Sequence, residues 1–270
     1  TEIADSDLPD SRSVAYIDGY FVWVATDGSS VFWSDVNNAD SISALSFFDA
    51  ESRPDGNLEV LVLGNDLYIF GGKSIERFRS TGNSESPFQR VSNSIISVGY
   101  IGGLIKSGDS AFFIGRADNA SVEVYEFNGS QVNVISNSVI SEYLNGIVST
   151  NIGTSDKLDR ARAQQWTDNG INIISFQTGS FRRSSFGSCF YFTRGENGSI
   201  NTGTLSDNPG NSASDARDWF KRDFFVDDID TDFSFINATK FQDRWYFQRE
   251  SDEAETGIHR LGLGHWNRGM

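Results

Sequence analysis

The sequence is poor in the residues that build metal centres, disulfides and rigid loops. It has one cysteine, one methionine, two histidines and four prolines in 270 residues. The single Cys189 excludes an intrachain disulfide and a cysteine-rich metal site, so we expect it to be a small buried apolar residue. No apolar run approaches the roughly 20 residues of a membrane-spanning helix, so we expect no membrane partner. Because the chain begins with Thr1, we expect it to be a piece of a longer protein.

Positive charge is also scarce. The chain has 37 acidic and 22 basic residues, which gives a formal net charge of −15. Tight DNA binding requires Lys and Arg residues that neutralise phosphates, so we predict that double-stranded DNA is not bound tightly. Many soluble β proteins are acidic too, so the net charge alone does not distinguish a surface that avoids DNA from that of an ordinary soluble β protein.

The residues that are abundant favour turns and pleated strands. There are 26 glycines and 22 phenylalanines, together with many Ser, Asn, Asp and Val residues. Aromatic residues such as Trp23, Phe70 and Phe113 lie in short apolar runs and are expected to pack in a core. The composition therefore predicts an all-β fold.

A hairpin pattern recurs five times along the chain. In each copy two short apolar strands flank a polar turn, as in Val14 to Ile17 and Tyr20 to Val24 around Asp18-Gly19. The other four turns are Gly64-Asn65-Asp66, Ser107-Gly108-Asp109, Asp168-Asn169-Gly170 and Gln242-Asp243. A third strand is expected after each hairpin, at Val31 to Trp33, Ile75 to Phe78, Val122 to Phe127, Cys189 to Phe192 and Ile258 to Leu261.

The spacing of these units predicts a β-propeller. The turn aspartates Asp18, Asp66, Asp109, Asp168 and Asp243 are separated by 48, 43, 59 and 75 residues, and we expect them to occupy equivalent hairpin tips. Four-stranded blades need about 40 to 50 residues, so the two longer spacings indicate insertions. We therefore predict one propeller domain over 1–270 with about five blades in this chain, or six if residues outside it complete the ring.

One insertion stands out by its composition. Residues 195–232 are polar and poor in β-branched residues, which predicts an exposed insertion that contacts other subunits or appendages. Within it, Ser214 to Lys221 has the pattern of a short helical turn, and Ser155 to Arg162 also reads as helical, with Ser155 as a cap.

The sequence offers no convincing catalytic, cofactor or metal site. Residues 227–232 alternate carboxylates like the start of a calcium loop, but Phe233 and Thr239 stand where an EF-hand requires Gly and Glu. His259 and His265 lack the motifs of a catalytic triad or a zinc helix. We predict that the protein is not an enzyme. One alternative stays open, a carbohydrate-acting propeller, either a glycosidase with paired carboxylates or a lectin-like protein.

Several runs resemble the packaged-DNA stabilisation proteins, the tail hub or nozzle proteins of short-tailed phages. They are Tyr16 to Val22, Ser43 to Asp55, Leu67 to Glu76, Ser80 to Asn83, Pro87 to Arg90, Phe113 to Asp118 and Val124 to Gly129, with weaker likeness at Trp166 to Gly170 and Trp266 to Gly269. The order and spacing of the runs agree with the family over about residues 14 to 145.

The resemblance implies a structural component of the virion. It implies a homo-oligomeric ring, six-fold in symmetry, that extends the portal channel below the portal and adaptor proteins. Such a ring helps to retain packaged DNA, lets DNA pass at ejection and anchors the tail needle and the tail fibres or spikes. An acidic channel wall would repel phosphates, so DNA would pass without tight binding.

Overall fold

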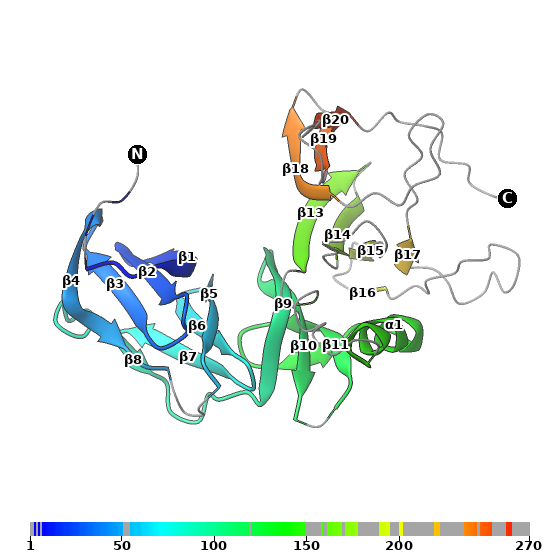
Figure 1. The fold of residues 1–270 in the computed structure, drawn as a ribbon. Coiled ribbons are helices and arrows are strands. Elements are labelled where there is room, and N and C mark those ends of the chain that lie inside the picture. Colours follow the sequence, from blue (N-terminus) through cyan, green and yellow to red (C-terminus); the bar gives the residue numbers. More distant parts are fainter. Residues whose placement is uncertain are drawn as a thin grey trace, which may run out of the picture. The chain divides into compact units, whose positions relative to one another are not determined.

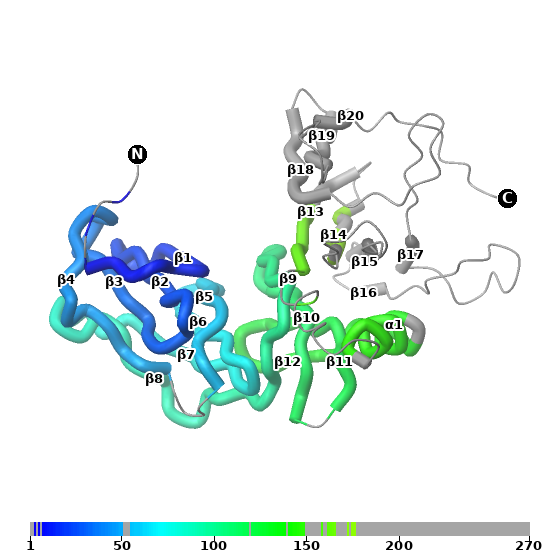
Figure 2. Tube along the Cα trace, in the orientation of Figure 1, coloured from blue at the N-terminus to red at the C-terminus, as the bar shows by residue number. Residues whose placement is uncertain are grey.

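The computed structural model describes residues 3, 5, 7–50, 55–118, 120–149, 158, 161–168 and 171–177 (Figure 2), of which 139, 149, 166–168, 171, 173 and 177 are described by their backbone alone. It also describes the backbone of 189–194, 200–201, 219–221, 235–241, 244–249 and 258–260. The chain divides into two compact units, Thr1–Ser136 and Asn137–Met270. The described part is mostly β-strand and is arranged in antiparallel sheets (Figure 1), so the predicted all-β class is confirmed.

The first unit contains three four-stranded sheets, each a meander in chain order. Sheet 1 consists of β1 (Ser11–Ile17), β2 (Tyr20–Ala25), β3 (Val31–Asp35) and β4 (Asn38–Phe48). Sheet 2 consists of β5 (Asn57–Leu63), β6 (Asp66–Gly71), β7 (Ile75–Ser80) and β8 (Phe88–Arg90). Sheet 3 consists of β9 (Val98–Ser107), β10 (Ser110–Ala117), β11 (Val122–Phe127) and β12 (Val132–Val134).

The second unit contains helix α1 (Ser138–Ser149) and two further sheets. In sheet 4 the order is β13 (Arg162–Asp168), β14 (Ile171–Gln177), β15 (Cys189–Arg194) and β16 (Ile200–Asn201), and β17 (Trp219–Lys221) also pairs with β15. In sheet 5 the order is β18 (Phe235–Phe241), β19 (Arg244–Arg249) and β20 (Ile258–Arg260). The five predicted third strands are confirmed as β3, β7, β11, β15 and β20.

All five predicted hairpins are present, and each joins the first and second strands of a sheet. The pairs next to the loops are Ile17 with Tyr20, Leu63 with Asp66, Ser107 with Ser110, Asp168 with Ile171 and Phe241 with Arg244. Two residues lie between the members of every pair. The five hairpins thus have the same loop length and the same place in their sheets, as five repeats of one unit require.

The turn aspartates themselves are not equivalent, which corrects the prediction. Asp18 is the first loop residue of its hairpin and Asp109 is the second, whereas Asp66 is already the first residue of β6. Asp18 and Gly19 have φ values of 50° and 89°, so both loop positions are left-handed, as in a type I′ turn. In the next two hairpins only the first position, Gly64 or Gly108, has positive φ, as a type II′ turn requires. Asp243 lies outside the described residues.

Helix α1 was not predicted from the sequence. Asn137 caps it, because its side-chain oxygen accepts a hydrogen bond from the Ile140 N–H at 3.0 Å. Ile140 and Leu144, one turn apart, are fully buried. The helix is rich in Ser, Val and Ile, which have modest helix propensity, so burial of this apolar face and the cap must determine it.

The predicted insertion at 195–232 contains two short strands. β16 and β17 both lie in this range and pair with β15. The predicted helical turn at 214–221 is wrong for Trp219–Lys221, which forms β17. The rest of the range and most of 155–162 lie outside the described residues, so the exposed insertion and the single domain over 1–270 stay predictions.

The three sheets of the first unit pack face to face through two apolar clusters. The cluster between sheets 1 and 2 includes Val22, Val24 and Trp33 against Leu67 and Ile69. The cluster between sheets 2 and 3 includes Tyr68, Phe70, Ile75, Phe113 and Phe127. Every residue of β6 is buried, because sheet 2 is covered on both faces, which explains its continuous apolar run. The aromatic residues of these strands therefore form core, as predicted.

The first strands of these sheets converge. β1 contacts β5, and β5 contacts β9, whereas β4 lies at the opposite edge of sheet 1. This is the arrangement of propeller blades, in which the first strands face the central axis. Among the helices that the structure describes, none is long and apolar enough to cross a membrane.

Candidate interaction surfaces

A buried carboxyl group ties the three converging strands together. The hydroxyl of Ser13 on β1 donates a hydrogen bond to Glu59 on β5 and accepts one from the Val60 N–H at 3.1 Å. The hydroxyl of Tyr100 on β9 also bonds to Glu59. Burial raises the pKa of Glu59, and the hydrogen bond from Ser13 and the charge of Arg12 offset this only in part. Glu59 is therefore a structural link between blades.

These strands do not hold the carboxyl pair that a glycosidase needs. Glu59 is the only acidic residue of β1, β5 and β9. Glycoside hydrolysis requires two carboxyl groups about 5 to 10 Å apart, one as the general acid and the other as the general base or the nucleophile. No observation on these strands favours the carbohydrate-acting alternative.

The same three strands carry few charged residues. They carry two cations, Arg12 and Lys106, and one carboxylate, Glu59. Lys106 donates a hydrogen bond to the carbonyl oxygen of Val62 at 3.1 Å. These strands face the axis of one propeller and not the channel of a ring of propellers, so the acidic channel wall stays a prediction.

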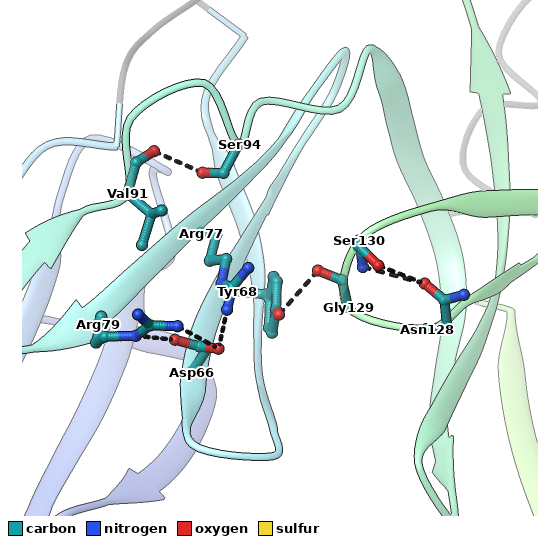
Figure 3. Close-up of polar contacts among 9 residues, drawn as sticks. All are labelled: Asp66, Tyr68, Arg77, Arg79, Val91, Ser94, Asn128, Gly129 and Ser130. Carbon is teal, nitrogen blue, oxygen red and sulfur yellow. Dashed lines mark hydrogen bonds and ion pairs between the residues drawn. The ribbon is translucent and has the colours of Figure 1, made fainter.

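A second polar cluster lies at the hairpin end of sheet 2. Asp66 pairs with Arg79 across β6 and β7, and Tyr68 pairs with Arg77, so the four side chains share one face. The carboxylate of Asp66 accepts hydrogen bonds from Arg77 Nη2 at 2.5 Å and from Arg79 Nε at 2.8 Å (Figure 3). We call Asp66, Arg77 and Arg79 the arginine cluster.

The arginine cluster is partly buried and carries a surplus positive charge. The exposed fractions of the side chains are 10% for Asp66, 26% for Arg77 and 57% for Arg79. Burial acts to raise the pKa of Asp66, but the hydrogen bonds and charges of Arg79 and Arg77 outweigh it and lower that pKa. Asp66 is therefore ionised, and one carboxylate faces two guanidinium groups.

Tyr68 joins the arginine cluster to sheet 3. Its hydroxyl donates a hydrogen bond to the carbonyl oxygen of Gly129 at 2.9 Å (Figure 3). Asn128 shapes this loop, because its side-chain oxygen accepts hydrogen bonds from the backbone N–H groups of Ser130 and Gln131 at 3.1 and 2.9 Å. The contact fixes the hairpin end of one blade against the outer loop of the next.

From the sequence, Asp66 was predicted only as a turn residue. The available signal was Arg77-x-Arg79, because residues i and i+2 of a strand share a face. Only the register of β6 and β7 places both arginines beside Asp66.

The third candidate surface is the face of sheet 1 that points away from sheet 2. Val14, Trp23, Phe32 and Phe47 are directly opposite one another across the four strands and form an apolar row. Tyr16 is more than half exposed and lies beside Phe21, with ring centroids 5.0 Å apart. Leu45, on β4, is 84% exposed.

This face is equivalent to faces that are packed in sheets 2 and 3. Tyr20 is the first residue after the hairpin loop of sheet 1, and Phe21 and Trp23 follow it by one and three residues, so equivalent positions can be found in the other sheets. Leu67 and Ile69 occupy the same positions in sheet 2 and pack against sheet 1. Ala111 and Phe113 occupy them in sheet 3 and pack against sheet 2. This face of sheet 1, where Trp23 is buried but Val14, Tyr16 and Phe47 are exposed, thus has the chemistry of a blade-to-blade interface.

The other candidate residues from the sequence do not form a site in the described structure. Cys189 lies on β15 and His259 on β20, whereas His265 and residues 227–232 lie outside the described residues. Among the described residues there is no group of three or more His, Cys, Asp or Glu side chains that could hold a metal ion.

Comparison with known proteins identifies the family. The family model described as bacteriophage P22 Gp10, beta-propeller, matches residues 1–170, which is more than half of the chain. No curated protein matches. The crystal structure of the N-terminal domain of Nup159 matches with 8% sequence identity and a TM-score of 0.38, over 90% of this chain and 74% of that chain. A likeness of that size carries no argument. The match over 1–170, together with the repeated four-stranded meanders, shows that this chain belongs to the phage P22 Gp10 β-propeller family and is a phage structural protein.

Proposed function

We propose that this protein is a subunit of the tail hub, or nozzle, of a short-tailed phage. In this role it forms a homo-oligomeric ring, a hexamer, that extends the portal channel in the virion tail. Its partners are the portal and adaptor proteins, the tail needle, and the tail fibres or spikes. The observation that carries the proposal is the family match over 1–170.

The packing of the sheets suits a part that must withstand the pressure of packaged DNA. Sheet 2 is buried on both faces, and its residues Glu59 and Tyr68 link it by hydrogen bonds to both neighbouring sheets or loops. Densely packed interiors have low compressibility and transmit load. A ring of such propellers would retain DNA mechanically and need no catalytic group.

The charge of the chain suits a channel through which DNA passes. A net charge of −15 disfavours the many phosphate contacts that would slow the DNA during ejection. We propose that double-stranded DNA passes through the ring without tight binding and that the polar residues 195–232 contact a neighbouring subunit or appendage.

The test is to locate the chain in the particle and to ask what its loss does. Electron microscopy of intact virions should show this propeller in a ring below the portal. Particles assembled without the protein should package DNA and then lose it. A location in the head shell, or full DNA retention in its absence, would refute the proposal.

A further inference from the structure

The arginine cluster has donors that its own carboxylate does not use. The carboxylate of Asp66 accepts hydrogen bonds from Arg77 Nη2 and Arg79 Nε, and a weaker one from Arg79 Nη2 at 3.4 Å. In the part of the chain that the structure describes, the buried Nε of Arg77 has no hydrogen-bond partner. Buried donors are nearly always satisfied, so this one needs an explanation. An approaching carboxylate cannot reach this buried atom without a shift of neighbouring side chains, so a partner meets the cluster through Arg79 and the exposed part of Arg77.

The cluster is also prepared for an anionic group. Asp66 holds both guanidinium groups in place on one face of the sheet (Figure 3), so little side-chain entropy remains to be lost on binding. The partial burial of Asp66 and Arg77 strengthens electrostatic attraction relative to open water. Arg79 is more than half exposed and can reach a partner.

We propose that Arg77 and Arg79 bind a carboxylate of a second copy of this chain. The inference rests on the ring proposed above. A second copy is the appropriate partner because the chain has 37 acidic residues against 22 basic ones, so an association between copies needs the few sites of surplus positive charge. A guanidinium pair binds a carboxylate in the bidentate geometry that arginine favours.

DNA phosphate is the less favoured ligand. Affinity for duplex DNA comes from many neutralised phosphates, and one surplus charge in a chain of net charge −15 does not provide them. The cluster lies on β6 and β7, the second and third strands of sheet 2, whereas the first strands of the three sheets converge at the axis. The cluster therefore lies away from the strands that converge at the axis of the propeller.

The experiment compares two charge reversals in the full chain. Arg79→Glu changes the arginine cluster, and Arg116→Glu is the matched control, because Arg116 is exposed on β10 and has no ion pair among the described residues. Self-association is measured by sedimentation velocity at low and moderate salt. Arg79→Glu should weaken association about tenfold or more and remove most of its salt dependence, whereas Arg116→Glu should leave both unchanged.

A second variant separates binding from folding. Arg79→Gln removes the charge but keeps a donor for Asp66, and should also weaken association while the chain retains its wild-type unfolding temperature. Equal ring formation by wild type, Arg79→Glu and Arg79→Gln would overturn this inference alone. A wild-type chain that stays monomeric would overturn the ring itself and this inference with it. Salt-sensitive binding of labelled duplex DNA that Arg79→Glu abolishes would assign the cluster to phosphate and overturn the carboxylate proposal.

Discussion

The close approach of sheets 2 and 3 at Gly99 gives the sharpest test of the fold. A Cβ atom added at Gly99 would lie 2.9 Å from the Cα of Lys73 and closer still to the carbonyl group of Gly72. Both neighbours are backbone, so no side chain can rotate away. Relief requires the two sheets to move apart next to the bridge between Ile75 and Ile96.

We expect Gly99→Ala to destabilise the protein by about 3 kcal/mol, the upper end of the cost of overpacking. For a protein of this size that loss corresponds to a fall of roughly 6 to 12 °C in the unfolding temperature. The matched control is Gly146→Ala, because no atom lies within 4 Å of a Cβ added at Gly146 in α1. Alanine there should stabilise the helix by about 0.5 to 1 kcal/mol.

The assay is urea and thermal unfolding of the full chain followed by far-ultraviolet circular dichroism. The same substitution, glycine to alanine, should lower the free energy of unfolding at position 99 and raise it at position 146. An unfolding temperature for Gly99→Ala within 2 °C of wild type would show that the two sheets do not approach as closely as described.

Three further predictions follow from individual contacts. The pKa of Glu59 is raised above its ordinary 4.5 in the folded protein, so the folded state binds the proton of Glu59 more tightly than the unfolded state does. The contribution of Glu59 to the free energy of unfolding is therefore greatest below pH 4.5 and is lost as the pH rises through the raised pKa. Glu59→Gln should remove that loss, and equal pH slopes of unfolding free energy for wild type and variant would contradict it. Tyr68→Phe deletes the hydrogen bond to Gly129 and should cost about 1 kcal/mol in urea unfolding, with no loss of helix signal. Asn137→Ala removes the cap of α1 and should cost about 1 kcal/mol, visible as earlier loss of helical signal, whereas Asn137→Asp should cost little because an aspartate caps as well.

Local sequence patterns were enough to predict the repeated unit. Loops such as Asp18-Gly19 have residues that tolerate positive φ, and the flanking runs are apolar, so hairpins and third strands could be placed closely by local chemistry. The family resemblance, carried by ordered runs between about 14 and 145, is supported by the match over 1–170. The short outer strands β8 and β12 could not be read, because three residues carry too little periodicity to separate strand from loop.

Contacts between polar residues of different blades could not be predicted in this way, because they depend on the tertiary packing. Glu59 lies 46 residues from Ser13, and Tyr68 lies 61 residues from Gly129, and no local pattern links either pair. The arginine cluster depends on strand register, since a shift of one residue would turn Arg77 and Arg79 to the opposite face of sheet 2. Helix α1 likewise depends on burial of Ile140 and Leu144. Turns and strands follow from short-range sterics, whereas the links between blades follow from packing between segments far apart in the chain.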